Sequence, residues 1–245
     1  MDVKSKAMVL LGMGGVGRDL VRQLVRERDN TAARYQLRLE VRCLADSVSR
    51  LGRTDRFLTD EELLTAVGCK EKNQPLTACG GVAGRSTAES LEPFLFSDSI
   101  LVDCTASDET ATILLRNLEC GGGIVLANKK PLTADWETYC ELTRDPVRAR
   151  WETTVGSCLP AITTLARLRA CGDRIERMAG CLSGTLGFLM SGLESDRFFA
   201  ELVIEAHRSG ATEPDPRDDL SGMDVARKAL ILARGAGFRM EMTQV

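Results

Sequence analysis

Residues 213–228, EPDPRDDLSGMDVARK, combine acids, bases and two prolines in one short segment. The prolines favour extended conformations at the residues before them, so the first half should be an acidic loop. Asp224 and Lys228 follow, four residues apart on an expected helix, at the border of its apolar face. Two interpretations stay open: an acid–base pair that holds a cationic or hydroxylic substrate and moves a proton, or a helix ion pair worth about 0.3–0.5 kcal/mol.

The helix that carries this pair should begin just after Ser221, which is a suitable N-cap. From Gly222 onward its apolar residues recur at helical spacing and predict one buried face. Arg227 and Arg234 lie away from that face on a helical wheel, so we expect both arginines to point to water.

The other end of the chain has the pattern of a dinucleotide site. A short apolar run at residues 6–12 leads into the glycine motif GMGGVG and then into apolar residues at helical spacing. In the order strand, glycine turn and helix, this motif lets backbone approach a pyrophosphate at the helix N-terminus. The residues assigned to the cofactor on this ground are Gly12, Gly14, Gly15, Val16 and Gly17. A second strand, 37–45, ends at Asp46, whose carboxylate should bind the adenosine ribose hydroxyls.

Two further apolar runs, 99–104 and 123–127, flank an expected helix at 108–120. This alternation predicts an α/β fold with a Rossmann-type, doubly wound parallel sheet covered on both faces, and a site at the carboxyl ends of its strands. Polar segments leave the sheet there at Thr105–Ser107 and at 128–131. Lys129 in the second segment could reach phosphate, nicotinamide or substrate, or it could be a solvated loop lysine.

The organisation changes near residue 150, so we expect an NAD(P)-binding domain at 1–150 and a second, α+β substrate domain at 151–245. Other elements predicted from pattern are helices at 59–67, 136–142, 161–169 and 198–209, strands at 151–160 and 175–180, a flexible connection at 76–90, and a turn of small residues at 183–187.

Composition excludes several classes of protein. The 245 residues are 44% hydrophobic with a net charge of −3, which gives no case for nucleic acid. No apolar run approaches the roughly 18 residues of a membrane span. The first strand begins near Lys6, which leaves no room for a targeting peptide, so we expect a cytoplasmic protein. Nine scattered cysteines without a CxxC pair indicate reduced thiols, and a single histidine, His207, argues against a serine triad or a multi-histidine metal site.

The chain resembles homoserine dehydrogenase, in particular the monofunctional type that is similar to plant members. The motifs that carry this resemblance run in order along nearly the whole chain: GMGGVG at 12–17, VDCTAS at 102–107, LANKKPL at 126–132, ETTVGSCLP at 152–160, LSGTLGF at 182–188 and EPDPRDDLSGMDVARK at 213–228. The glycine motif is generic, whereas the last motif together with NKKPL and SGTLG is specific.

The resemblance implies a Rossmann domain joined to an α/β substrate domain. It also implies NAD(P)-dependent interconversion of L-aspartate 4-semialdehyde and L-homoserine, an oxidoreductase step in threonine, methionine and isoleucine biosynthesis. Asp46 should favour NAD by repelling a 2′-phosphate, but Arg50 and Arg53 follow closely and should offset it, so we expect use of both NAD and NADP.

The resemblance also implies a role for individual residues. Lys228 matches the proposed proton donor and acceptor at the substrate oxygen, and Lys129 the second active-site lysine, between cofactor and substrate. The positions that match substrate-binding residues are Glu213, Asp219, Asp224 and Thr185, and those that match nicotinamide-side contacts are Thr105 and Gly210.

A monovalent cation, sodium, is implied for the loop Glu152–Leu159. Its ligands would be the acid Glu152 and the backbone carbonyls of Val155, Ser157 and Leu159. The chain departs from the family here, because Ser157 and Cys158 replace the usual Ala and Gly, and Cys158 should meet a glycine position with positive φ.

Family members continue beyond the equivalent of Val245, through strands that complete the substrate domain and a homodimer interface. We therefore expect the substrate domain to be incomplete relative to the family, with homodimerisation only when that region is supplied. Residues 1–245 alone should bind NAD(P) but show little or no turnover. Two alternatives stay open: a catalytically impaired, dinucleotide-binding homologue that pairs with or regulates a full-length enzyme, and a dehydrogenase for another amino-acid aldehyde.

Overall fold

The computed structural model describes residues 3–210, 212, 217 and 220–245. The chain forms two compact units, described separately below. The first consists of Met1–Pro131 and Glu137–Trp151, and the second of Leu132–Trp136 and Glu152–Val245. The division at Trp151 lies one residue from the boundary expected from sequence, but the segment Leu132–Trp136 belongs to the second unit.

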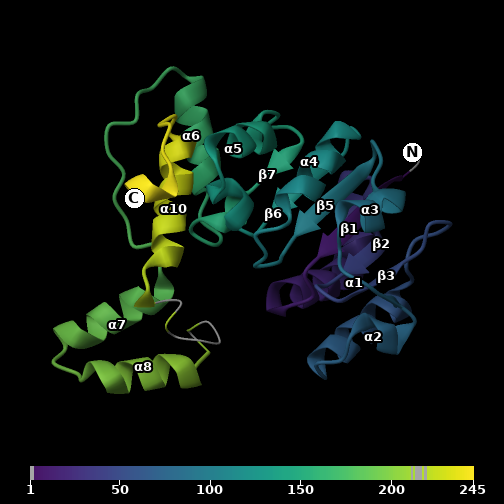
Figure 1. Ribbon diagram of the computed structural model, residues 1–245, viewed down its shortest axis with the longest axis horizontal. Coiled ribbons are helices and arrows are strands. Elements are labelled where there is room, and N and C mark those ends of the chain that lie inside the picture. The colour runs from purple at the N-terminus through teal and green to yellow at the C-terminus, as the bar shows by residue number, and fades with distance from the viewer. Residues whose placement is uncertain (1–2, 211, 213–216, 218–219) are drawn as a thin grey trace. The chain divides into compact units, whose positions relative to one another are not determined.

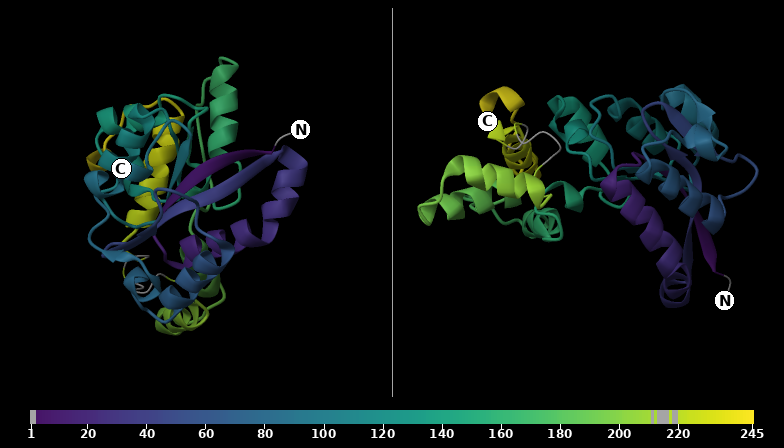
Figure 2. Two further views of the ribbon diagram at one scale, coloured as in Figure 1. Left: turned by 90° about the vertical axis from the view of Figure 1, so that its right-hand side faces the viewer. Right: turned by 90° about the horizontal axis from the view of Figure 1, so that it is seen from below.

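The first unit is built on a seven-stranded sheet with the order β4-β3-β2-β1-β5-β6-β7 (Figure 1). Its strands are β1 Lys4–Leu11, β2 Leu37–Ala45, β3 Ser49–Gly52, β4 Val82–Ala83, β5 Ser99–Asp103, β6 Gly123–Leu126 and β7 Ala149–Arg150. The five strands from β2 to β7 in this order are parallel, whereas β3 pairs antiparallel with both β2 and β4. β1 and β2 run side by side along their whole length (Figure 2). The parallel, Rossmann-type sheet is therefore confirmed.

Helices cover both faces of this sheet. They are α1 Gly15–Tyr35, α2 Asp60–Glu71, α3 Ala88–Leu91, α4 Ala111–Glu119 and α5 Trp136–Thr143, with 3-10 turns η1 Leu76–Cys79, η2 Glu92–Phe94 and η3 Lys130–Thr133. The steps from β1 to β2 and from β5 to β6 go in opposite directions across the sheet, and right-handed crossovers then place α1 and α4 on opposite faces. The strands between them are buried on both sides, as the runs at Ala7–Leu11 and Leu101–Asp103 show.

The sequence-based prediction of this unit missed short elements at its edge. β3 and β4 are only four and two residues long, and they pair antiparallel beyond β2. The connection 76–90, expected to be a flexible loop, contains η1, β4 and the start of α3. Helix α1 also extends to Tyr35, through polar residues that lie beyond its apolar pattern. Edge strands and polar helix ends have no apolar period, so the pattern gave no sign of them.

The second unit has helices but no strand among its described residues. Its elements are η4 Glu152–Thr154, α6 Ala161–Ala170, α7 Gly184–Glu194, α8 Phe199–Arg208, α10 Met223–Gly235 and η5 Met242–Gln244. Helix α6 packs beside α10, and α7 packs beside α8 (Figure 1). Ser183 lies at the N-cap of α7, where its hydroxyl accepts a hydrogen bond from Leu186 N at 3.1 Å, so the expected small-residue turn is the start of a helix.

Two strands expected in this unit are not formed. In segment 151–160, Gly156 and Ser157 have φ of +80° and +55°, which no strand allows, and η4 begins the segment instead. Segment 175–180 has no assigned strand, and all but Ile175 of its side chains are exposed. A strand is stabilised by a hydrogen-bonded neighbour, which this segment lacks in the part of the chain described.

The prediction that Arg234 points to water was wrong. Its side chain is fully buried and its guanidinium is hydrogen-bonded within the protein. It donates to the carbonyl oxygens of Met240 and Leu132, both at 2.9 Å, and to Glu241 Oε2 at 2.8 Å. The guanidinium also lies 5.8 Å from the centre of the Trp136 ring. Because Glu241 Oε1 accepts from the Trp136 backbone N–H, Arg234 and Glu241 together hold the segment Leu132–Trp136 against α10.

We expect Arg234→Met to lower the free energy of unfolding by about 2–4 kcal/mol, because two carbonyl oxygens and one carboxylate lose a buried donor. Thermal and urea unfolding followed by tryptophan fluorescence would measure the loss. Arg227→Met, on the same helix, is the matched control and should change stability by less than about 1 kcal/mol. Equal losses in the two variants would contradict this role of Arg234.

Candidate active site

A crevice of about 530 Å³ opens in the first unit at the carboxyl ends of β1, β2 and β5. Its lining comes from the turns after β1, β2 and β5, from the end of α2 and from the segment before α3. The lining residues are Leu11, Gly12, Met13, Gly14, Arg18, Ala45, Asp46, Ser47, Lys70, Asn73, Arg85, Ser86, Thr87, Thr105, Ala106, Ser107, Glu109 and Thr110. The crevice lies where the strand order reverses, which is the position at which doubly wound sheets bind ligands.

The glycine motif fits a dinucleotide for three separate steric reasons. A Cβ atom on Gly12, whose φ is +91°, would lie 2.7 Å from the Cys104 carbonyl carbon and oxygen. A Cβ atom on Gly17 would lie 1.9 Å from the Gly12 carbonyl oxygen, so only glycine lets α1 pack this closely on the turn. Gly14 and Gly15 have nothing within 4 Å of that position and leave the backbone open for a ligand. The N-terminus of the 21-residue helix α1 has no acidic residue in its first turn and no side-chain cap, so it favours an anion.

Asp46 lies in the crevice, as the sequence predicts, but its carboxylate is already engaged. Oδ1 accepts hydrogen bonds from Val48 N, Ser49 N and Ser49 Oγ at 2.9, 2.7 and 2.9 Å, and Oδ2 pairs with Lys70 Nζ at 2.8 Å. Burial alone would raise the pKa of Asp46, but the hydrogen bonds from Lys70, Val48 and Ser49 outweigh it and hold the pKa below its usual value. The carboxylate therefore stays ionised and is neutralised by Lys70.

The cation that offsets Asp46 is a residue that the sequence did not reveal. Arg53 pairs with Glu62 at 3.1 Å, and Arg50 is not among the described residues that line the crevice. Lys70 comes from the last turn of α2, 24 positions after its partner, and no local pattern links the two.

Thr105 lies in the crevice wall, with its hydroxyl turned toward the protein. The hydroxyl donates to Asp103 Oδ1 at 2.7 Å and accepts from Ser107 N at 3.2 Å. Burial and the nearby Asp103 raise the pKa of the neighbouring Cys104 thiol to about 11, so it stays protonated. All nine cysteines are free, in agreement with reduced thiols.

Lys129 lies half-buried in the turn after β6. Its neighbour Lys130 forms an ion pair with Asp108 at 2.8 Å, back to the segment that follows β5. The turns after β5 and β6 therefore contact each other at the carboxyl edge of the sheet.

The second unit brings together two of the predicted residues, Lys228 and Asp224. Lys228 Nζ forms an ion pair with Asp224 Oδ2 at 2.6 Å and donates to the Leu182 carbonyl oxygen at 2.7 Å. The two side chains are 16% and 34% exposed, so the pair is half-buried and still accessible. Thr185 follows Leu182 by three residues and is buried in the first turn of α7.

The helix that carries this pair, α10, has Gly222 as its N-cap, with φ of +74°, and not Ser221 as predicted. The Ser221 hydroxyl instead accepts a hydrogen bond from Met223 N at 3.2 Å.

Of the remaining predicted site residues, the structure describes Gly210. Gly210 lies just after α8 with φ of +71° and is exposed. Glu213 and Asp219 lie outside the described residues.

In the loop proposed for a cation, the carboxylate of Glu152 is already hydrogen-bonded to the start of α6. The Glu152 carboxylate accepts from Ile162 N at 3.0 Å, and from Thr163 N and Thr163 Oγ1 at 3.0 and 2.7 Å, so it caps the start of α6. The positive φ falls on Gly156 and Ser157, and not on Cys158 as expected. No group of three or more His, Cys, Asp or Glu side chains that could hold a metal occurs among the described residues.

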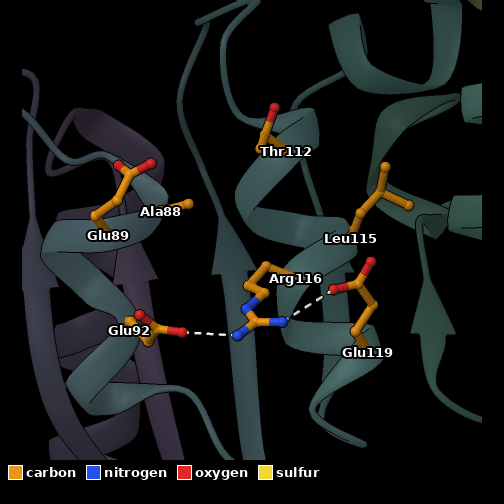
Figure 3. A pocket seen from close by; sticks show the side chains of 7 residues that line it. All are labelled: Ala88, Glu89, Glu92, Thr112, Leu115, Arg116 and Glu119. Carbon is orange, nitrogen blue, oxygen red and sulfur yellow. Dashed lines mark hydrogen bonds and ion pairs between the residues drawn. The ribbon is translucent and has the colours of Figure 1, made fainter.

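Two other hollows contain neither a glycine turn nor any of the predicted catalytic residues. One, between α3 and α4, has Arg116 between Glu92 and Glu119 at 2.7 and 3.2 Å, and its charged side chains are largely exposed (Figure 3). The other, between α6 and α10, has a mainly apolar lining.

In the part of the chain that the structure describes, no helix has the length and apolar character to cross a membrane.

Comparisons with known proteins cover nearly the whole chain. A sequence model of the homoserine dehydrogenase NAD-binding domain matches residues 12–149, and a model of homoserine dehydrogenase matches residues 160–245. The bifunctional aspartokinase/homoserine dehydrogenase of Haemophilus influenzae is 36% identical over 246 residues, which cover 97% of this chain and 28% of that protein. Because this relative is bifunctional by name, the monofunctional type stays a prediction.

Solved structures give the same result for the fold. Homoserine dehydrogenase from Thermoplasma acidophilum has a TM-score of 0.75 at 26% identity and covers 99% of this chain and 72% of its own. A hyperthermophilic archaeal homoserine dehydrogenase in complex with NADPH has a TM-score of 0.75 at 22% identity, which shows the fold alone, and covers 95% and 70%. The chain thus spans less than a third of the curated relative's length and about 70% of these two structures. By the two matched models, the chain belongs to the homoserine dehydrogenase family.

Proposed function

We propose that this chain is an NAD(P)-dependent oxidoreductase that interconverts L-homoserine and L-aspartate 4-semialdehyde, in the pathway to threonine, methionine and isoleucine. The observation that carries the proposal is the half-buried Lys228–Asp224 pair, which lies in the part matched by the family model. The open glycine turn in the part matched by the NAD-binding model supports it independently. A catalytically impaired homologue finds no support in these matches.

In this proposal Lys228 moves the proton at the substrate oxygen. Its ammonium has three N–H bonds, of which one points to Asp224 and one to the Leu182 carbonyl oxygen. The third would bind the substrate oxygen, donating a proton during reduction and recovering it during oxidation. The bound nicotinamide supplies or accepts the hydride. Asp224 and Leu182 orient the ammonium so that no reorganisation is needed when the proton moves.

The remaining roles follow the family resemblance. We propose that Glu213, Asp219 and Asp224 bind the α-ammonium group, with Thr185 as a hydroxyl contact. Lys129 would act as the second active-site lysine, and Thr105 and Gly210 would form the nicotinamide side of the site. Since the hydroxyl and the backbone N–H of Thr105 both donate to Asp103, its contact with the cofactor would come from the backbone carbonyl oxygen.

Three further proposals rest on the resemblance alone. Sodium could bind to carbonyl oxygens of Val155, Ser157 and Leu159, but Glu152 would have to give up hydrogen bonds to α6, so no step is assigned to the ion. Homodimerisation and a cytoplasmic location likewise stay predictions.

We propose that the crevice accepts both NAD and NADP. The hyperthermophilic archaeal homoserine dehydrogenase was solved in complex with NADPH, and the Asp46–Lys70 pair explains how an acid at the end of β2 could tolerate a 2′-phosphate. Lys70 neutralises Asp46 for NAD and could turn its ammonium toward the phosphate of NADP, with Arg85 as a second cation in the lining.

The test of the function is homoserine-dependent formation of NADPH or NADH, measured by absorbance on the purified protein. We expect a homoserine-dependent signal, even a slow one, that another amino alcohol of similar size does not produce. Dinucleotide binding without any such turnover would instead favour the non-catalytic homologue. Faster oxidation of a different amino alcohol would favour the dehydrogenase for another aldehyde.

Lys228→Ala should lower kcat by about 10²–10⁴, because a general acid–base catalyst is lost, and should leave cofactor binding nearly unchanged. Lys228→Arg is the matched control for charge: it keeps a cation beside Asp224 but cannot release its proton near neutral pH. Steady-state kinetics with both variants would separate proton transfer from charge. Near-normal turnover by either would remove Lys228 from this role.

Lys70→Met should weaken NADPH binding by about ten- to a hundredfold, the equivalent of one charge-assisted hydrogen bond, with little effect on NADH. Lys72→Met, two residues on at the exposed end of α2, serves as the control and should change neither affinity. Fluorescence titration with each reduced cofactor gives both constants. A parallel loss for NADH and NADPH would mean that Lys70 has no part in selectivity.

A further inference from the structure

A buried polar cluster lies beneath the turns that follow β5 and β6. At its centre is Asp103, the last residue of β5, with no exposed surface. Its Oδ1 accepts from Thr105 N and Thr105 Oγ1 at 2.9 and 2.7 Å. Its Oδ2 accepts from Thr110 Oγ1 at 2.6 Å and from Asn128 Nδ2 at 3.0 Å. Four donors therefore satisfy a carboxylate that would otherwise be costly to bury.

Asn128 connects this cluster to the turn that contains Lys129. Asn128 is 4% exposed, and its Nδ2 lies 3.0 Å from Asp103 Oδ2 and 2.8 Å from the Ser107 carbonyl oxygen. Its Oδ1 accepts from Lys130 N at 3.1 Å, which closes an Asx-type turn around Lys129. The backbone N–H groups of Ala127 and Asn128 both donate to the Asp103 carbonyl oxygen, at 2.8 and 3.1 Å. The backbone is thus fixed on both sides of Lys129.

The two segments joined by this cluster have different tasks in the proposed function. Thr105 and Ser107 line the dinucleotide crevice, whereas Lys129 stands between cofactor and substrate in the proposal above. From these contacts we infer that Asp103 and Asn128 are positioning residues, which couple the cofactor-binding wall at Thr105–Ser107 to the placement of Lys129. The inference rests on the proposed function for its effect on turnover, but the coupling itself is a property of the first unit.

A matched control contacts the same two strands. Asn117, on α4, is also fully buried and joins the opposite ends of β5 and β6. Its Oδ1 accepts from Ser99 Oγ at 2.6 Å, and its Nδ2 donates to the Gly123 carbonyl oxygen at 2.7 Å. Asn117 and Asn128 therefore have the same side chain, similar burial and the same two strands to connect, at opposite ends of the sheet. A purely structural role predicts equal effects of replacing them.

The experiment compares Asn128→Ala with Asn117→Ala in the whole chain. Both variants should lose stability to a similar extent, but only Asn128→Ala should lower kcat, by about 10- to 100-fold, as expected when a reacting group is misplaced by about 1 Å. The KM for the cofactor should change by less than about threefold, since the glycine turn is untouched. Equal kcat values in the two variants would overturn the inference, and absence of homoserine turnover in the parent chain would instead overturn the proposed function.

Hydrogen exchange gives a readout that does not need turnover. In the parent chain, NADPH should slow amide exchange at 104–110 and also at 128–130, because the cluster couples the two segments. In Asn128→Ala the protection at 128–130 should be lost while that at 104–110 remains, and Asn117→Ala should retain both. Loss of protection at both segments, or at neither, would contradict the coupling.

Two conservative variants of Thr110 distinguish loss of one hydrogen bond from a general folding defect. Thr110→Val keeps the shape of Thr110 but removes the hydroxyl that donates to Asp103, whereas Thr110→Ser keeps the hydroxyl. The valine variant should show the same loss of coupled protection at 128–130 as Asn128→Ala, and the serine variant should restore it. Identical behaviour of the two Thr110 variants would count against a network that works through Asp103.

Discussion

The proposed cofactor site depends on the close approach of two chain segments at the ends of β1 and β5. The Gly12 backbone lies against that of Cys104, and Gly17 packs on the Gly12 carbonyl oxygen, at separations that leave no room for a side chain. This approach brings the N-terminus of α1 to the carboxyl end of the sheet, where its free N–H groups face the crevice. The crevice is thus a consequence of backbone packing, and the side chains around it adjust its charge.

The carboxyl ends of β5 and β6 lie at the edge of the sheet where the crevice opens. Polar groups at such an edge must be satisfied within the protein when a ligand excludes water. Asp103 meets this requirement by collecting donors from the turns after both strands. The hydrogen bonds that stabilise the buried Asp103 carboxylate therefore also connect the wall of the crevice to the turn around Lys129. Stability and the geometry of the proposed site have a common origin here.

The sequence predicted the parts of this molecule whose residues are close together along the chain. Strand β2 was predicted to the residue, and the glycine turn was recognised because strand, glycines and helix are contiguous. The partners of Asp46 and Arg234 were missed because Lys70 lies 24 positions away and Leu132 lies 102 positions away. The prediction for Arg234 used only the apolar pattern of its own helix and the usual exposure of arginine, and neither contains the carboxylate and the two carbonyl oxygens outside the helix that bind it.

The two lysine–aspartate pairs have different exposures, and this difference bears on what each can do. Asp46 is 10% exposed, its Oδ1 accepts three hydrogen bonds from Val48 and Ser49, and its Oδ2 pairs with Lys70, so most of its charge is neutralised within the protein. Asp224 is 34% exposed beside a lysine that is 16% exposed, so a substrate could approach either group. An ion pair that reacts must be open on one side and held on the other, and only the second pair has that form. This difference supports the proposal that Lys228 moves the proton, and that Lys70 sets the charge that a cofactor meets.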